Sequence, residues 1–296
     1  MTRDSSPLHL VFAGTPAFAI PSLEALANNS AFCVDLVVTQ PDRPVGRKGV
    51  ITPPPVKIAA QGLSVPVWQP EDINAETRSS ELQALPCDFL VVVAFGQILA
   101  PSILAIPMIA PINLHASLLP RWRGASPIQH AILAGDPETG VTVQRMVKEL
   151  DAGPVLAQER TPIDPRETYA SLHDRLASMG ARLLVETLQR PCEPRKQSED
   201  HVTHCKKLSR ASGVVDPKTM TAEEIDRCVR ALHPWPGVTL MQGDGRMLKI
   251  LAADLKPSAG AAKLACRDAT TLYLLRVQTA GGKPLTGQEW ERGKRP

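Results

Sequence analysis

The sequence predicts an α/β protein: a parallel, doubly wound sheet followed by a smaller basic module. Two observations predict this. Apolar, β-branched runs alternate with amphipathic stretches over roughly the first two thirds of the chain, and the composition changes after residue 190. The 296 residues are enough for two domains, and 43% hydrophobic with 21% charged residues is ordinary for a globular protein.

The alternation begins with an apolar run at residues 8–13 that ends at Gly14. Pro16 then opens an amphipathic stretch to about Ala27, and a second β-branched run covers residues 33–39. The pattern continues as helix, strand, helix and strand at 54–61, 65–68, 73–85 and 88–95. Strands that alternate with helices favour a parallel sheet with right-handed crossovers.

The same domain is expected to continue to residue 190. A short apolar strand carries Asn113 and His115, a short helix runs over 126–133 with Ser126 as its cap, and strands follow at 140–146 and 154–157. A long amphipathic helix over 166–189 closes this domain, which we expect to span residues 1–190.

Residues 191–220 are rich in Pro, Lys, Ser and Gly, which indicates a linker. Residues 221–296 form the second domain. A capping box at Thr221 starts a helix to Leu232, and short β-type runs follow at 237–241, 247–252 and 271–277. This pattern is typical of small barrel-like modules that handle nucleic acids. Residues 255–269 hold little strand-forming sequence, so we expect the barrel to be incomplete there.

Charge and cysteine usage limit the function classes. The net charge is only +3, but residues 1–202 are slightly acidic and residues 203–296 basic. This distribution suggests a polyanionic partner, although a solvated basic surface is by itself the commoner explanation. Six scattered cysteines without a C-x-x-C pair indicate reduced thiols rather than a disulfide framework or a zinc site. No apolar run reaches about 18 residues. We expect a cytoplasmic monomer with no metal and no membrane partner.

The polar groups that favour catalysis follow one apolar strand. Asn113 and His115 are two residues apart, so both leave the same face, at the end of a strand where open α/β sheets place their chemistry. Asp151, in Leu-Asp-Ala-Gly-Pro, completes a set suited to acyl transfer: two donors for an oxyanion and an acceptor for the proton of the amine. No serine or cysteine lies in an elbow motif, which favours direct transfer. A lone His or Asp in such a place is more often structural, and only their convergence favours catalysis.

A long connection at residues 40–57 carries Arg43, Arg47 and Lys48 between prolines and glycines. Crossover loops usually have about 2–6 residues, and a longer basic loop suits phosphate contact. The turn Phe-Ala-Gly-Thr-Pro at residues 12–16 holds a single glycine, so it does not support a dinucleotide site.

The chain resembles the formyl-folate-dependent formyltransferases. The resemblance is carried by Ile-Asn-Leu-His-Ala-Ser-Leu-Leu-Pro-Arg-Trp-Arg-Gly, Gly-Val-Thr-Val-Gln and Leu-Asp-Ala-Gly-Pro. Phe-Ala-Gly-Thr-Pro, Gln-Pro-Asp-Arg-Pro-Val-Gly-Arg, Thr-His-Cys-Lys-Lys-Leu and Arg-Ala-Leu-His-Pro-Trp-Pro-Gly resemble the members that act on methionyl-tRNA. The resemblance implies a 10-formyltetrahydrofolate donor and, as acceptor, the α-amino group of methionine on initiator tRNA.

The resemblance also implies a fold and the roles of particular residues. The fold is a Rossmann-like doubly wound formyltransferase domain with a smaller C-terminal OB-like β-barrel. Asn113, His115 and Asp151 match the catalytic positions of the family. The folate-binding turn corresponds to Ser117, Leu118, Leu119 and Pro120, and the expected nucleic-acid contacts are Arg43, Arg47, Lys48, Lys206 and Lys207.

Two other functions fit parts of the pattern. A formyl-folate enzyme acting on a small amine, such as a nucleotide or sugar, would use the same three residues but would need neither the basic loop nor the basic module. A non-enzymatic RNA-binding protein on this scaffold would be expected to lack one of Asn113, His115 and Asp151, and all three are present.

Overall fold

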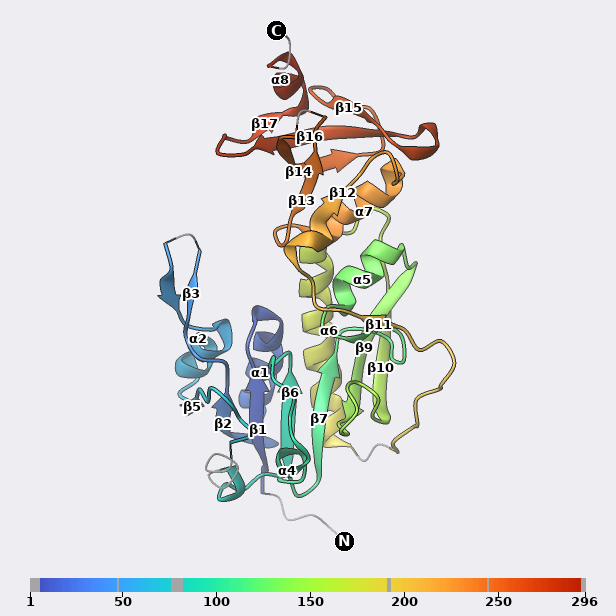
Figure 1. Cartoon of the computed structure of the whole chain (residues 1–296). Helices are drawn as coiled ribbons and strands as arrows, with labels where there is room; N and C mark the ends of the chain where they lie inside the picture. Colours follow the sequence, from blue (N-terminus) through green and yellow to red (C-terminus); the bar gives the residue numbers. More distant parts are fainter. Residues whose placement is uncertain (1–5, 47, 76–81, 191–192, 244, 294–296) are drawn as a thin grey trace. The chain divides into compact units, whose positions relative to one another are not determined.

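The computed structural model describes residues 6–46, 48–75, 82–190, 193–243 and 245–293 (Figure 1). The chain divides into two compact units, each built from more than one stretch. The first comprises residues up to 124, 140–161 and 173–204, and the second comprises 125–139, 162–172 and 205–296. The expected domain limits at residues 190 and 220 stay a prediction. Across the described ranges, no helix combines the length and apolarity that a membrane crossing requires.

The first unit is built on a seven-stranded sheet with the order β10-β9-β7-β6-β1-β2-β5. Its strands are β1 (Leu8–Gly14), β2 (Phe32–Val38), β5 (Val67–Trp68), β6 (Phe89–Val93), β7 (Ala110–His115), β9 (Glu138–Arg145) and β10 (Val155–Pro162). The pairs from β5 to β7 are parallel, which confirms the predicted α/β core. Figure 1 shows β2, β1, β6 and β7 side by side.

At one edge the sheet is mixed, so the expectation of a wholly parallel sheet is wrong there. β9 runs antiparallel to β7, with His115 paired to Thr142 and Ile112 to Arg145. The chain between β7 and β9 does not cross back to the amino ends of the strands, so β9 starts beside the carboxyl end of β7 and runs the other way.

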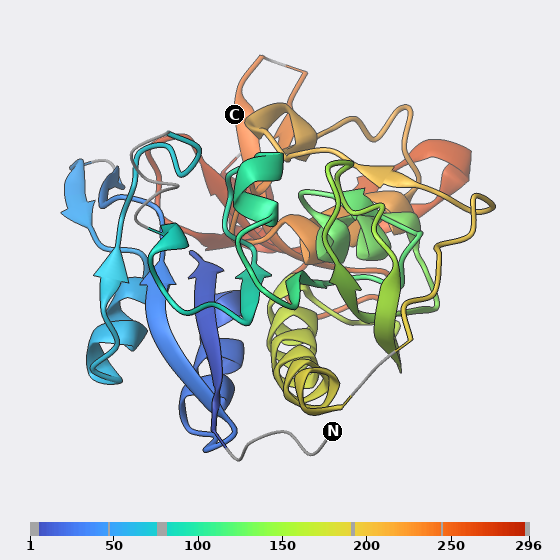
Figure 2. The ribbon, with the colours of Figure 1, turned by 90° about the horizontal axis from the view of Figure 1, so that it is seen from below.

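Apolar residues on both faces make the central strands. All five residues of β6, Phe-Leu-Val-Val-Val, are buried, as parallel strands covered on both sides require. One face carries Val11 and Ala13, which belong to a core cluster with Ile103 of α4 (Pro101–Leu104). The helices α1 (Ile20–Ala27), α2 (Pro55–Gly62) and α6 (Tyr169–Gln189) lie on the other face of the sheet, as Figure 2 shows. The 3₁₀ turn η1 (Ala17–Ala19) directly precedes α1. The helix predicted over 73–85 falls partly on residues outside the described ones.

The packing of α6 fixes which way β7 turns its side chains. An ideal Cβ built on Gly180 of α6 would lie 2.7 Å from Leu114 Cδ2, so Leu114 faces this helix at close range. Because strand side chains alternate, Asn113 and His115 leave the opposite face of β7. This confirms that the two share a face.

The long basic connection contains a hairpin that the sequence pattern does not show. β3 (Arg43–Val45) pairs antiparallel with β4 (Val50–Thr52), and Gly46 and Gly49 take positive φ values of 72° and 62° between them. Three-residue strands are too short to reveal an alternating pattern. The side chains of Val45, Val50 and Ile51 are exposed.

The second unit carries a sheet of order β12-β13-β14-β16-β15, with β17 paired to β16. Its elements are α5 (Pro127–Ala134), η2 (Arg210–Gly213), β12 (Val214–Val215), α7 (Ala222–Leu232), β13 (Val238–Met241), β14 (Met247–Asp254), β15 (Ala262–Ala265), η3 (Arg267–Ala269), β16 (Thr271–Thr279), β17 (Leu285–Thr286) and α8 (Gly287–Arg292). A separate two-stranded sheet pairs β8 (Arg123–Gly124), which belongs to the first unit, with β11 (His204–Cys205). α7 packs against α5, β14 and β16.

The capping box of α7 is confirmed, whereas the cap expected for α5 is wrong. Glu224 N donates to Thr221 Oγ1 at 3.2 Å, and Thr221 N donates to Glu224 Oε2 at 2.7 Å. Ser126 precedes α5 as expected, but its side chain makes no capping hydrogen bond. Pro127, at the first helical position, instead removes one of the N–H groups that a cap would satisfy.

The segment 255–269 does contain a strand, so its expected lack of strand structure is wrong. β15 pairs antiparallel with β16, from Ala262 opposite Leu274 to Ala265 opposite Thr271. The sequence Ala-Lys-Leu-Ala has no β-branched residue, and pairing with the long β16 decides its conformation. Within the described ranges no pairing closes the sheet from β12 to β15. The OB-like barrel therefore stays a prediction.

A buried carboxylate ties elements of the second unit together. Asp226 of α7 has a side chain only 1% exposed, and Arg166 Nη1 donates to both its oxygens at 2.9 Å. Arg230 Nε donates to Asp226 Oδ2 at 2.8 Å, and its Nη1 donates to Glu167 O at 2.7 Å. The charge of Asp226 is thus compensated by two guanidinium groups, as burial requires.

Candidate active site

The carboxyl end of β7 brings an amide, an imidazole and a carboxylate together. Asn113 Nδ2 donates to Asp151 Oδ1 at 3.2 Å, and His115 Nδ1 lies 3.7 Å from the same oxygen. The side chains of His115 and Asp151 are 7% and 9% exposed, and Asn113 is half-buried. The three residues predicted to converge are therefore neighbours within the first unit.

The Asp151 carboxylate is held by neutral donors on both oxygens. Gly124 N donates to Oδ2 at 2.8 Å, and Gln144 Nε2 donates to Oδ1 at 3.1 Å beside Asn113. Asp151 has a left-handed backbone with φ of 51°, a conformation that Asp tolerates better than most residues. These contacts fix the direction of the carboxylate toward β7.

The histidine ring is oriented from its other nitrogen. His115 Nε2 lies 2.9 Å from Trp122 O, and because a carbonyl can only accept, Nε2 carries the hydrogen. Nδ1 therefore faces Asp151, and a second proton there would place an imidazolium beside the carboxylate. Arg121 lies over the Trp122 ring, 4.6 Å from its centroid, which explains the aromatic residue between two arginines as a cation–π pair.

The turn that resembles a folate site is held rigidly by β9 and β10. Ser117 is fully buried; its Oγ donates to Arg121 O at 2.5 Å, and its carbonyl accepts from Thr142 Oγ1 at 2.6 Å. Gln158 Nε2 donates to Leu119 O at 2.8 Å and to Thr142 Oγ1 at 2.9 Å. The Ser117 hydroxyl therefore shapes the turn from inside.

Close packing completes the turn. The Leu119–Pro120 bond is cis. A Cβ atom added to Gly140 would lie 2.7 Å from Leu118 Cδ2 and 2.0 Å from Glu159 O. Only glycine fits at residue 140.

The basic residues expected at a nucleic-acid interface are partly described. Arg43 Nη2 lies 2.5 Å from Glu71 Oε2 in an exposed pair, and Lys48 is exposed between β3 and β4. Lys206 and Lys207 are exposed in the second unit. Arg47 lies outside the described residues.

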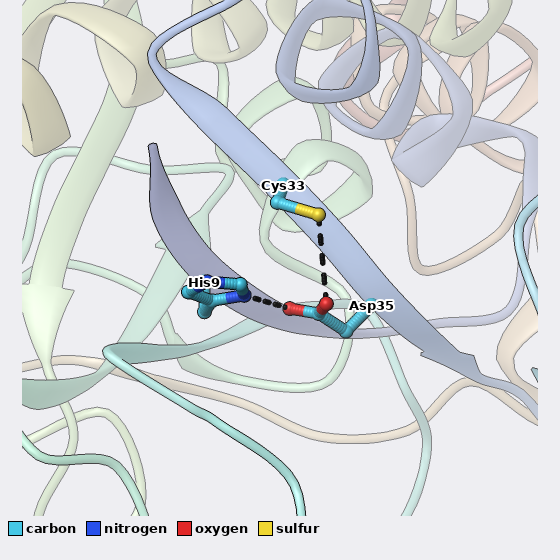
Figure 3. A group of neighbouring side chains, drawn as sticks. All are labelled: His9, Cys33 and Asp35. Atoms are coloured by element: carbon cyan, nitrogen blue, oxygen red, sulfur yellow. Dashed lines mark hydrogen bonds and ion pairs between the residues drawn. The ribbon is translucent and has the colours of Figure 1, made fainter. Parts of the chain in front are cut away.

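A second polar group lies at the amino-terminal half of β1 and β2, where Figure 3 shows His9, Cys33 and Asp35 pointing toward one another. His9 Nδ1 donates to Asp35 Oδ2 at 2.9 Å and Cys33 Sγ to Asp35 Oδ1 at 3.5 Å. Burial, and next the Asp35 charge, raise the pKa of the Cys33 thiol. An imidazole, a thiol and a carboxylate are groups that bind zinc. Because His9 lies on β1 and the other two residues on β2, the spacing of the residues along the sequence does not reveal the cluster. The expected absence of a metal stays a prediction.

Two buried glutamines near Asp151 are not among the site residues expected from the sequence. Gln144 on β9 is 2% exposed and Gln197 is 7% exposed. Gln144 ends the Gly-Val-Thr-Val-Gln stretch that carries part of the family resemblance, but its sequence context gives it no role, and Gln197 falls in the segment predicted to be a linker. Only the folded chain reveals that both are directed at the loop that carries Asp151.

Comparisons with known proteins show the family of the chain. A family model described as formyl transferase matches residues 8–188, and one described as formyl transferase, C-terminal domain, matches 207–295. A methionyl-tRNA formyltransferase of Halorhodospira halophila is 46% identical over 97% of this chain and 96% of its own. Another, of Stutzerimonas stutzeri, is 44% identical over 95% and 93%.

Solved structures share the fold at lower identity. An N-formyltransferase from Helicobacter canadensis, in complex with folinic acid and dTDP-3-aminofucose, has a TM-score of 0.67 at 18% identity and covers 92% of this chain and 99% of its own. HypX from Aquifex aeolicus, in complex with tetrahydrofolic acid, has a TM-score of 0.61 at 16% identity over 97% of this chain and 47% of its own. With two family models that together span most of the sequence, the chain is an enzyme of the formyl transferase family, related over nearly its whole length to methionyl-tRNA formyltransferases.

Proposed function

We propose that this enzyme transfers the formyl group of 10-formyltetrahydrofolate to the α-amino group of methionine on initiator tRNA. The observation that carries the proposal is the meeting of Asn113, His115 and Asp151 in one hydrogen-bonded group at the carboxyl end of β7. The names of the most similar relatives support methionyl-tRNA as the acceptor, and the folate compounds bound to the solved relatives support the donor.

The reaction begins when the lone pair of the amine attacks the formyl carbon. A carbon–nitrogen bond forms, and the carbonyl electrons move to oxygen to give an oxyanion. Asn113 Nδ2 keeps one N–H beyond the one given to Asp151, and protonated His115 offers another at Nδ1. Each such donor contributes on the order of 3 kcal/mol to stabilising the oxyanion.

Collapse of this intermediate breaks the bond between the formyl carbon and N10 of the folate. The attacking amine must lose a proton and N10 must gain one. Asp151 accepts the proton of the amine, directly or through one water, and passes it to N10 as the bond between N10 and the formyl carbon breaks. Direct transfer leaves no covalent intermediate on the enzyme.

The substrates are placed by two further sets of residues. The turn of Ser117, Leu118, Leu119 and Pro120 receives the folate, and its hydrogen bonds to Thr142 and Gln158 reduce the ordering needed on binding. The phosphates of the tRNA meet Arg43 and Lys48 on the hairpin, Lys206 and Lys207 in an OB-like second domain, and Arg47, which lies outside the described residues. The enzyme acts as a cytoplasmic monomer.

The test is formyl transfer from 10-formyltetrahydrofolate to initiator methionyl-tRNA, run beside elongator methionyl-tRNA, free methionine and an amino-sugar nucleotide. We expect rapid transfer to the initiator tRNA alone. Transfer that is fastest to the sugar nucleotide would replace this proposal with the small-amine alternative. Tight tRNA binding without transfer to any acceptor would favour the binding protein.

A further inference from the structure

The segment of residues 193–204 lies between the stretches matched by the two family models, and its composition predicts a linker. The structure gives it fixed partners in the first unit. Arg195 N donates to Val155 O and Val155 N donates to Arg195 O, both at 2.8 Å. Trp122 N donates to Thr203 Oγ1 at 2.8 Å, and Arg123 N donates to Thr203 O at 2.9 Å. The segment is thus bonded both to β10 and to the turn that follows the folate site.

Gln197 is the residue of this segment that reaches the catalytic loop. Its side chain is nearly buried, and Nε2 donates to Asp151 O at 2.8 Å and to Gly153 O at 2.7 Å. Its Oε1 accepts from Arg123 Nε at 3.0 Å and from Nη2 at 2.7 Å. One amide therefore connects the backbone on both sides of Ala152 to a guanidinium in the turn after β7.

The loop that Gln197 holds is tightly constrained. An ideal Cβ on Gly153 would lie 1.8 Å from Arg145 O, so the backbone there is pressed against β9. Asp151 has a left-handed backbone. Its carbonyl and that of Gly153 point to Gln197, and loss of the amide would remove a partner from two carbonyls at once. The loop would then relax, and the Asp151 carboxylate would move with it.

We propose that Gln197 is a positioning residue for formyl transfer: it holds the 151–153 loop so that the Asp151 carboxylate stays against Asn113 and His115. This inference rests on the proposed function, because it requires Asp151 to act in the reaction. Gln197 makes no contact with substrate in this scheme and acts through Asp151. Arg123 in turn orients Gln197 through two hydrogen bonds to its oxygen.

The experiment compares Gln197→Leu and Gln197→Asn with Asp151→Asn and with Gln189→Leu, the same change at an exposed end of α6. Gln197→Leu removes both polar ends at similar size. Gln197→Asn keeps the amide but is one methylene too short to reach both sides, and it keeps the test possible if the leucine variant does not fold. The measurements are kcat and KM for both substrates, the pH profile of kcat, binding of 5-formyltetrahydrofolate and the melting temperature.

We expect both Gln197 variants to lower kcat about 10- to 100-fold and to alter the pH profile, since displacement of a reacting group by about 1 Å can cost 10²-fold. The KM values and folate binding should stay within about twofold of the parent, and Gln189→Leu should match the parent. A lower melting temperature with unchanged kcat, or a loss confined to KM, would overturn the inference while leaving the proposed function intact. Full activity in Asp151→Asn would instead refute the proposed role of Asp151.

Discussion

Replacing Asp151 with Asn tests the site most directly, because it changes the charge and one acceptor while keeping the shape. Three donors converge on the carboxylate: Gly124 N on Oδ2, and Asn113 Nδ2 with Gln144 Nε2 on Oδ1. An asparagine has one oxygen, so its NH₂ group must meet either the Gly124 N–H or the two side-chain amides. Whichever way the amide turns, at least one donor faces another donor.

The magnitude follows from two losses. The proposed proton acceptor is removed, which for general acid–base catalysis costs typically 10²- to 10⁴-fold. The hydrogen bond that aligns Asn113 is weakened, and so is the charge that faces His115. We therefore expect kcat to fall about 10³-fold, equivalent to about 4 kcal/mol of transition-state stabilisation.

The assay is single-turnover formylation of initiator methionyl-tRNA with saturating 10-formyltetrahydrofolate. Asp174→Asn is the matched control, since Asp174 is a carboxylate of the same unit whose side chain is 81% exposed. The control should react like the parent, and both variants should bind tRNA equally. A rate for Asp151→Asn within threefold of the parent would refute the reasoning, because neither the proton nor the alignment would then depend on the carboxylate.

Three further predictions concern other parts of the chain. Asp226→Ala leaves the buried guanidinium of Arg230 without its carboxylate and should lower the free energy of unfolding by about 3 kcal/mol, measured by urea denaturation; an unchanged midpoint contradicts it. Asp35→Asn removes a charge that raises the pKa of Cys33, so alkylation of Cys33 by iodoacetamide, followed by mass spectrometry, should speed up at pH 8 and reach its plateau at lower pH; equal rates would rule out the charge. Arg47→Ala, chosen from the sequence, should weaken use of tRNA and reduce the salt dependence of kcat/KM, and an unchanged salt slope would make the loop a mere connector.

The core of the fold could be predicted from the sequence because burial on both faces produces unbroken apolar runs. The run around β6 and the alternation that gives Asn113 and His115 one face are visible in the residues themselves. The direction of β9 could not be predicted in this way, since periodicity does not distinguish parallel from antiparallel pairing. The strand β15 could not either, because its pairing with β16 overrides a weak local preference.

The candidate site divides in the same way. Asn113 and His115 lie on one strand, so their proximity follows from local geometry. Asp151 reaches them from a separate loop, so its choice rests on the chemistry that acyl transfer needs and on the family resemblance, and not on local geometry. For Gln197, neither local strand geometry nor the family resemblance pointed to a role. It lies in a polar, proline-containing stretch whose composition indicates a connector, and its role depends on carbonyls contributed by a distant turn.

Two glycines of the first unit that lie against backbone carbonyls, Gly140 and Gly153, have a consequence for how this enzyme tolerates mutation. A methyl group at residue 140 would overlap Glu159 O, and one at residue 153 would overlap Arg145 O. Neither glycine has a side chain that could touch a substrate, yet alanine at either place would push apart the strand edges that carry the 117–120 turn and the Asp151 loop. A saturation mutagenesis screen for inactive variants should therefore find these two sites as often as the three proposed catalytic residues. In such a screen, the frequency with which substitutions abolish activity reports steric tolerance as much as chemistry.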